Sequence, residues 1–284
     1  MQPRIIISMF RNILIPVDFQ LNTEMAVKKA LEFSDPAQTV IHLFHVQKPP
    51  LPWKSGWANE MFYREVKERI PYQLSQWTEL IRNSYPDIKV ITSIEYGMGI
   101  QKSIIKKAKN IKPELIIIGK HSYHNKFTFL NTVFPNRIAK LTGCPVLTFK
   151  PGSAYTTIRS IVVPVGPEIP RRKVDLIVSL KEKFRITIHL VTVINKKQNQ
   201  NKFSAYSLLE TYRVLKDYVQ CPLNHEVLHG ENIAKSAFDY AKSIKADILL
   251  VEPESETKLS SFPQKHINDE LKPNSKLQIL AVQS

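Results

Sequence analysis

The chain is 284 residues long and 43% hydrophobic, which suffices for two hydrophobic cores of ordinary domain size. Its formal net charge of +15 indicates either an anionic partner or lysines dispersed over solvated helices. No basic arm or base-stacking motif is visible, so we expect no specific nucleic-acid partner. The apolar runs are too short for a membrane span, and Cys144 and Cys221 make no disulfide framework. These features predict a cytoplasmic protein without a membrane partner.

A short apolar segment occurs twice in the chain. Residues 11–18 read RNILIPVD and residues 159–166 read RSIVVPVG, with an offset of 148 positions. A glycine that precedes a helix and then a buried-type apolar run also recurs, at Gly97 and at Gly230. Self-similarity over this length indicates a duplicated domain.

Strand-type and helix-type segments alternate in the first half. Asn22 or Thr23 can cap the first helix, and Pro71 should kink or restart the long helix that follows the second strand. Gly97 and Gly99 form the turn into the next helix. The predicted strands are residues 13–17, 39–46, 89–95, 115–118 and 146–149.

The last helix of the first half is predicted to start at Thr132, whose hydroxyl can cap it. The apolar spacing places Val133, Ile138 and Leu141 on its inner face. Gly143 fits the end of this helix.

The second half repeats this order of elements. Helices are predicted at residues 174–184 and 208–219, and a third helix follows Gly230. The predicted strands are residues 161–165, 187–193, 225–228, 248–251 and 277–282. Residues 252–275 are polar and show no periodicity that assigns them.

Near-continuous apolar strands that alternate with helices are typical of a parallel sheet covered by helices on both faces. The predicted fold class is therefore α/β, with two doubly wound, Rossmann-like domains that form an internal pseudo-dimer. The first domain is predicted to span residues 1–152 and the second residues 153–284, with the Pro-Gly-Ser sequence at residues 151–153 as the linker.

The sequences NILIPVD at residues 12–18, ELIIIG at residues 114–119 and CPVL at residues 144–147 resemble the universal stress protein family, in a tandem two-domain form. The resemblance covers almost the whole first half and covers the second half more weakly. It implies a regulatory role in the stress response. Many members of that family bind ATP, and some do not.

The resemblance implies an adenine-nucleotide site in the first half. In the family's nucleotide binders, an aspartate after the first strand holds the ribose or base, and a Gly-x-x-Gly loop followed by Gly-Ser/Thr holds the phosphates. Glycines let backbone N–H groups approach phosphate oxygens, and the following helix N-terminus favours negative charge. Carried over to this chain, the candidate nucleotide-binding residues are Pro16, Val17, Asp18, Val46, Gly119, His121, Ser122, Asn131, Thr132 and Val133.

The phosphate loop of the first half departs from the family pattern. Ser122 replaces the second glycine, and Asn131 replaces the glycine of the Gly-Ser/Thr pair. Eight residues separate these two positions, whereas the family pattern has nine. Asn tolerates a left-handed backbone better than most residues, and Thr132 keeps the hydroxyl. We therefore expect weak binding of ATP or another adenine nucleotide, with no metal beyond nucleotide-associated Mg²⁺.

The second half lacks the residues that form such a site. Gly166 replaces the aspartate, and the loop opens with Glu252 and Pro253. Glutamate puts negative charge where phosphates would lie, and proline removes an N–H donor. We expect no nucleotide in this half, which then serves as a structural partner of the first.

Other interpretations exist for individual residues. The Asp18 carboxylate can instead cap the turn that follows it. His121 and His124 are three residues apart, but no Cys or carboxylate cluster accompanies them, so we predict no metal site.

The sequence thus predicts a tandem universal stress-type protein whose first domain binds adenine nucleotide weakly. The alternative is a nucleotide-free protein-interaction scaffold of the same fold. No Ser-His-Asp order, paired carboxylates or complete P-loop is apparent, so we do not expect ATP hydrolysis. The predicted partners are a second copy of the chain, through self-association, and a protein that the sequence does not identify.

Overall fold

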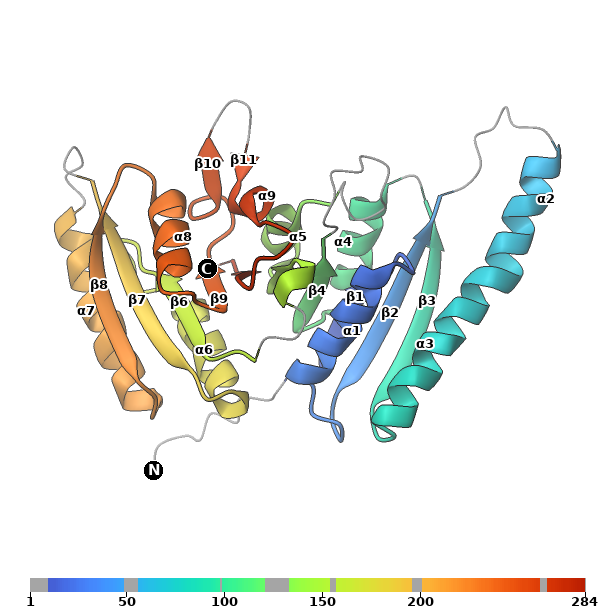
Figure 1. Ribbon diagram of the computed structural model, residues 1–284, viewed down its shortest axis with the longest axis horizontal. Coiled ribbons are helices and arrows are strands. Elements are labelled where there is room, and N and C mark those ends of the chain that lie inside the picture. The colour runs from blue at the N-terminus through green and yellow to red at the C-terminus, as the bar shows by residue number, and fades with distance from the viewer. Residues whose placement is uncertain are drawn as a thin grey trace. The chain divides into compact units, whose positions relative to one another are not determined.

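The structure, a computed structural model, describes residues 10–48, 56–97, 99–120, 133–153, 157–195, 201–260 and 265–283, without the side chains of residues 56–59, 201–203 and 260 (Figure 1). The chain divides into two compact units at residue 134. The first unit covers residues 10–134 and the second covers residues 135–284.

The first unit is an α/β unit with a parallel sheet. Its strands lie in the order β3-β2-β1-β4, and every described pairing among them is parallel. Helix α1 packs on β1 and β4, α4 packs on β2, and α3 packs on β3. The elements are β1 (Asn12–Pro16), α1 (Leu21–Phe33), β2 (Val40–Gln47), α2 (Gly56–Arg64), a π-helical turn (Glu65–Arg69), α3 (Ile70–Ser84), β3 (Lys89–Tyr96), α4 (Ile100–Ile111) and β4 (Leu115–Gly119).

The first-unit elements follow from local sequence. The apolar residues of β1 and β4 are fully buried, as expected for central strands covered on both faces. Pro71 has no N–H to donate to the carbonyl four residues earlier, and a π-helical turn stands immediately before α3, which carries Pro71 in its first turn. The predicted restart of the long helix at Pro71 is therefore confirmed.

The second unit contains a larger sheet in the order β5-β12-β9-β6-β7-β8. Helix α7 packs on β7 and β8, and α8 packs on β6, β7 and β9. The elements are α5 (Pro135–Thr142), β5 (Val146–Phe149), a 3₁₀ turn (Pro151–Ser153), β6 (Ser160–Pro164), α6 (Arg171–Lys183), β7 (Thr187–Ile194), α7 (Asn201–Tyr218), β8 (Leu223–His229), α8 (Ile233–Ser243), β9 (Ile248–Val251), β10 (Lys258–Ser260), β11 (Lys265–His266), α9 (Ile267–Glu270) and β12 (Gln278–Ala281).

Helix α5 and strand β5 belong to the second unit. Strand β5 pairs antiparallel with β12, whereas β12 pairs parallel with β9. The amide of Asn268 in α9 donates to Asn136 Oδ1 in α5 at 2.9 Å, and both side chains are buried. The compact units therefore divide before α5, while the duplication boundary at residue 152 stays a prediction from the sequence repeat.

In both halves, an acidic side chain accepts hydrogen bonds from the backbone at the start of the first strand. Glu114 Oε2 accepts hydrogen bonds from the backbone N–H groups of Arg11 and Asn12, the latter at 3.3 Å. Asp247 Oδ2 accepts from Arg159 N at 2.8 Å and from Ser160 N at 3.0 Å. Each acid precedes the strand that pairs beside the first strand of its half, which supports the duplication inferred from sequence.

Three local predictions differ from the structure, and a fourth agrees with it. Helix α5 begins at Pro135, later than the predicted start at Thr132. Helix α1 has Gln20 at its N-cap, so Asn22 and Thr23 lie in the first turn rather than at the cap. Leu141 is 42% exposed because it falls on the outer side of α5, whereas Val133 and Ile138 are buried as predicted. Gly143 ends α5 with φ at +67°, as expected for a glycine at a helix end.

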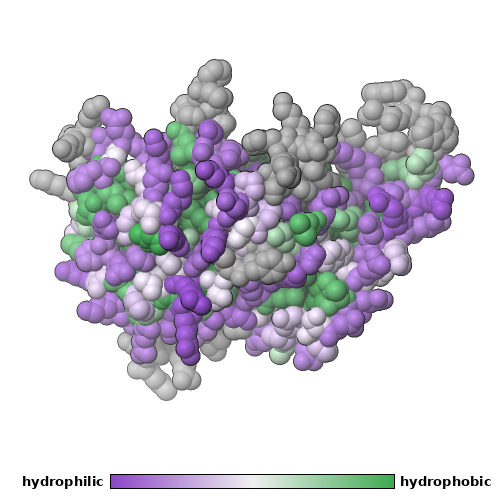
Figure 2. Space-filling view, viewed as in Figure 1, coloured by the Kyte–Doolittle hydropathy of each residue, from purple (hydrophilic) through white to green (hydrophobic). Residues whose placement is uncertain are grey.

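The segment 252–275, which the sequence did not assign, forms β10, β11 and α9. Figure 2 shows a face covered mainly by hydrophilic residues, with smaller apolar patches among them. In the described ranges, no helix is both long enough and apolar enough to cross a membrane.

Candidate functional site

The candidate site of the first unit lies at the carboxyl ends of β1 and β4. The chain crosses from β1 to β2 on one side and returns to β4 on the other, so the strand order reverses between β1 and β4. Open α/β sheets bind ligands at this kind of switch point. Pro16 ends β1, Asp18 follows it, and Gly119 ends β4, so the structure places these predicted residues at one edge of the sheet.

The Asp18 carboxylate is buried and held by its own turn. Its Oδ1 accepts a hydrogen bond from the backbone N–H of Gln20 at 3.1 Å and another from the Thr23 hydroxyl at 3.0 Å. The Asp18 N–H donates in turn to Thr23 Oγ1 at 3.1 Å. Phe19 between them has φ at +59°, in the left-handed region. Asp18 therefore does cap the following turn through one oxygen, and this turn fixes the carboxylate at the strand end.

Strand β2 supports the same edge with residues that sequence reasoning did not single out as site-forming. His45 Nδ1 bonds the carbonyl of Val17 at 2.9 Å, and the Phe19 ring lies against the His45 ring with a centroid distance of 4.7 Å. The Val17 N–H donates to Phe44 O at 2.9 Å, and the predicted residue Val46 is buried on β2. The signal for His45 in the sequence is a polar residue within a mostly apolar, buried strand.

The side predicted to hold phosphates is only partly described. Gly119 is buried at the end of β4, and the next residue, Lys120, is 8% exposed. Val133 is fully buried, and the adjacent Phe134 N–H donates to Gln101 Oε1 at 2.8 Å. The predicted site residues His121, Ser122, Asn131 and Thr132 lie outside the described residues.

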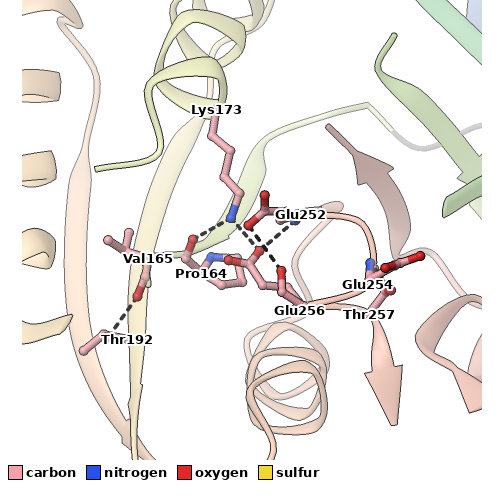
Figure 3. Close-up of polar contacts among 9 residues, drawn as sticks. Pro164, Val165, Lys173, Thr192, Glu252, Glu254, Glu256 and Thr257 are labelled. Carbon is pink, nitrogen blue, oxygen red and sulfur yellow. Dashed lines mark hydrogen bonds and ion pairs between the residues drawn. The ribbon is translucent and has the colours of Figure 1, made fainter. Parts of the chain in front are cut away.

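The matching strand ends of the second unit are filled by a buried ion pair (Figure 3). Lys173 Nζ donates to the carbonyl of Pro164 at 2.8 Å and to Glu256 Oε2 at 2.5 Å. The same Glu256 oxygen accepts the backbone N–H of Glu252 at 2.8 Å. The side chains of Lys173 and Glu256 are only 1% and 8% exposed. The chain's own carboxylate therefore occupies the start of the loop that follows β9.

Burial changes the pKa of the carboxyl group in this pair. Loss of hydration raises the pKa of the Glu256 carboxyl, while the Lys173 ammonium and the Glu252 N–H oppose that rise. Sequence reasoning missed both residues. The signal for Lys173 was its position four residues before Ile177 and seven before Leu180, which makes it a lysine on the inner face of α6.

A cleft of about 250 Å³ lies beside this pair at the carboxyl ends of β6 and β7. The Thr192 hydroxyl on its wall donates to Val165 O at 2.9 Å. Asn232 caps α8 by accepting from Lys235 N at 2.8 Å, and its amide donates to Lys258 O at 3.0 Å. These polar wall groups are thus satisfied within the protein.

No group of three or more His, Cys, Asp or Glu residues that could hold a metal ion occurs in the part of the chain that the structure describes. Cys144 is buried and Cys221 is half-buried, and neither forms a disulfide within the described residues.

Comparison with known proteins places the chain in a family. The model of the Universal stress protein family matches residues 9–150, which is half of the chain. A search of curated proteins found no match. The chain is similar to a universal stress protein from Archaeoglobus fulgidus DSM 4304, with 13% identity, a TM-score of 0.62 and 96% coverage of both chains. It is also similar to a functionally unknown protein from Pseudomonas aeruginosa PAO1, with 17% identity, a TM-score of 0.60 and coverage of 96% of this chain and 92% of that chain. These two likenesses show the α/β fold over nearly the whole chain. The family match over half of the chain establishes that the chain belongs to the universal stress protein family.

Proposed function

We propose that this protein is a regulatory stress-response module of the cytoplasm whose first half binds an adenine nucleotide weakly. Membership of the universal stress protein family supports the stress-response role. The nucleotide would lie at the carboxyl ends of β1 and β4, against Pro16, Val17, Asp18, Val46 and Gly119, with its phosphates toward His121, Ser122, Asn131, Thr132 and Val133.

The contrast between the two switch points carries this proposal. The first half presents a buried carboxylate at Asp18 and a glycine at Gly119, followed by the positive charge of Lys120. The second half has the buried Lys173–Glu256 pair at the corresponding place. The Glu256 carboxylate lies at the start of the loop after β9, where phosphates would bind, whereas Asp18 follows β1, where the ribose would bind. A carboxylate disfavours an anionic ligand beside it, so the first half is the better host for phosphates.

The residues of the first half fit the sugar end of a nucleotide. The Gln20 N–H and the Thr23 hydroxyl hold the Asp18 carboxylate at the end of β1, and a carboxylate is an acceptor for the hydrogen bonds that ribose hydroxyls donate. Gly119 has no side chain to obstruct a ligand beside β4. When bound, the nucleotide would supply the signal that the module reads, and no residue of this site is assigned a catalytic step.

Calorimetric titration with ATP, ADP and AMP at millimolar concentrations tests the proposal. We expect binding heat with the wild type and none with Asp18→Ala, while Asp18→Asn should keep the turn and report the effect of charge alone. Gly166→Ala is the matched control in the second half, because a Cβ there would meet no atom within 4 Å. Absence of heat with all three nucleotides would sink the nucleotide proposal.

A second candidate function is a nucleotide-free interaction scaffold. The observation that favours it is the hydrogen bonding of Asp18, which has a structural role in its own turn without any ligand. Native mass spectrometry of the purified protein separates the two functions, because a co-purified nucleotide supports the first and its absence supports the second. The same spectrum tests the self-association that we propose for the chain.

A further inference from the structure

A groove of about 460 Å³ lies between α3 and β3, on a different part of the first unit from the strand ends. Its α3 wall is formed by residues spaced three and four apart, among them Thr78 and Arg82. Its β3 wall is formed by residues that include Val90, Thr92 and Ile94, which alternate along the strand. The groove therefore follows the direction of the strand.

Strand β3 is the outermost strand of its sheet, and among the described residues it pairs only with β2. The Gly97 N–H donates to Gln47 O at 3.1 Å, on the β2 side. Backbone groups of successive residues in a strand point to opposite sides, so those of Val90, Thr92 and Ile94 point away from β2. The residues that line the groove thus also carry the main-chain donors and acceptors of the outer edge.

The groove has a positive end and an aromatic end. Arg82, near the end of α3, lines the groove, is exposed and forms no ion pair within the described ranges. Glu79, one turn before Arg82, adds a negative charge farther along the wall. Near the end of β3, Phe62 contacts Tyr96 with a centroid distance of 6.2 Å.

The second half has the corresponding space filled by two rings. Tyr212 stands six residues before the end of α7, as Thr78 does in α3, and His225 stands five residues before Gly230, as Thr92 does before Gly97. The rings of Tyr212 and His225 contact each other with a centroid distance of 5.0 Å. Small residues at the same two positions leave the groove open in the first half.

We propose that this groove binds an extended peptide segment of a partner protein, which adds to β3 as a further strand. Strand addition satisfies the outward backbone groups of β3, and the side-chain pockets give specificity. The peptide would place an acidic residue at the Arg82 end and an apolar residue over Thr78 and Thr92. The chain's net charge of +15 favours an acidic partner over a second copy, which would also bring its own α3 beside β3.

The test uses the full chain and a phage-displayed library of short random peptides, followed by fluorescence anisotropy with the selected peptides. We expect selected sequences that pair an acidic residue with β-branched or aromatic residues. Filling the groove with Thr78→Tyr and Thr92→His should weaken their binding about tenfold or more. The control pair Tyr212→Thr and His225→Thr, in the second half, should leave the affinity unchanged.

Two further measurements keep the test decisive if the filled variant folds poorly. The surface change Arg82→Glu should weaken acidic peptides and strengthen versions that carry lysine instead. Hydrogen exchange should show that bound peptide protects the amides of Val90, Thr92 and Ile94. Recovery of no binding peptide, equal binding to the filled variant, or protection elsewhere would overturn the proposal. Self-association that disappears in the filled variant would assign the groove to a second copy and overturn it as well.

Discussion

Strands β1 and β6 have nearly the same sequence, but different side chains interact with the backbone and side chains at their carboxyl ends. The third residue of the following helix accounts for this difference. It is Thr23 in α1 and Lys173 in α6. The short Thr23 hydroxyl bonds Asp18 within the same turn, whereas the long Lys173 side chain bonds Glu256 from a distant loop. One half therefore keeps a carboxylate at its switch point, and the other holds an internal ion pair there.

The framework around these ends is nevertheless the same in both halves. His45 bonds the carbonyl of Val17 at 2.9 Å, and Thr192 bonds the carbonyl of Val165 at 2.9 Å. Both side chains come from the second strand of their half and hold the residue that leaves the first strand. Duplication thus preserved the strand geometry, while single residues changed what the geometry can hold.

The largest expected effect comes from breaking the buried pair. Lys173→Met leaves the Glu256 carboxylate buried without its cation, which should lower the free energy of unfolding by about 3–5 kcal/mol. Urea denaturation at neutral pH measures this loss. The double variant Lys173→Met/Glu256→Leu should recover most of it, because replacing a whole buried pair by apolar residues is often neutral. A loss below about 1 kcal/mol in the single variant would show that the pair behaves as a solvated one.

A smaller loss is expected from Thr23→Val at the corresponding position of the first half. The change removes the hydroxyl that donates to Asp18 Oδ1 and accepts from the Asp18 N–H. Two buried groups lose a partner, so the free energy of unfolding should fall by about 1–3 kcal/mol. Thr192→Val removes one such hydrogen bond in the second half and should cost less. An equal or larger loss from Thr192→Val would contradict the central role of the Asp18 turn.

Acidification should weaken the contributions of two histidines to stability, that of His42 in the first half more than that of His189 in the second. The pKa of His42 is lowered from its ordinary 6.5 by burial and then by the nearby Lys107 and Lys89 cations. Its Nδ1 is buried without a hydrogen-bond partner among the described residues, so protonation there is unfavourable. The stability from neutral His42 is present above pH 6.5 and is lost as the pH falls toward the folded-state pKa.

Unfolding measured from pH 7 to pH 5 tests this pH dependence. His42→Gln should flatten the curve more than His189→Gln does, because burial lowers the pKa of His189 as well but Glu226 opposes it. If the two variants show the same dependence of unfolding free energy on pH, the prediction that His42 contributes more than His189 is wrong.

The smallest effect is expected at an exposed ion pair within the second unit. Lys140 in α5 bonds Glu254 at 2.7 Å, with side chains 48% and 55% exposed. Lys140→Ala should change the free energy of unfolding by only about 0–1 kcal/mol, and raised salt should remove the difference. A larger loss would mean that this contact, rather than the buried pair, is what fixes the loop after β9.

The sequence by itself determined the duplication, the α/β class and most of the strands. Strands such as β1, β4 and β9 are apolar along their whole length, and this pattern is readable because each residue's burial follows from its own position in a central strand. The glycine turn before α4 and the restart at Pro71 were predictable because both depend only on local backbone chemistry. The sequence also located Asp18 and Gly119 at the strand ends that form the candidate site.

Only the tertiary structure decided which distant residues meet. Lys173 and Glu256 are 83 positions apart, and no periodicity links a lysine in a helix to a glutamate in a polar loop. The pairing of β5 with β12 and the open groove beside β3 likewise depend on how separate elements pack. Local propensity fixes the conformation of each segment, but ion pairs, strand partners and grooves arise from contacts between segments, so sequence patterns alone do not specify them.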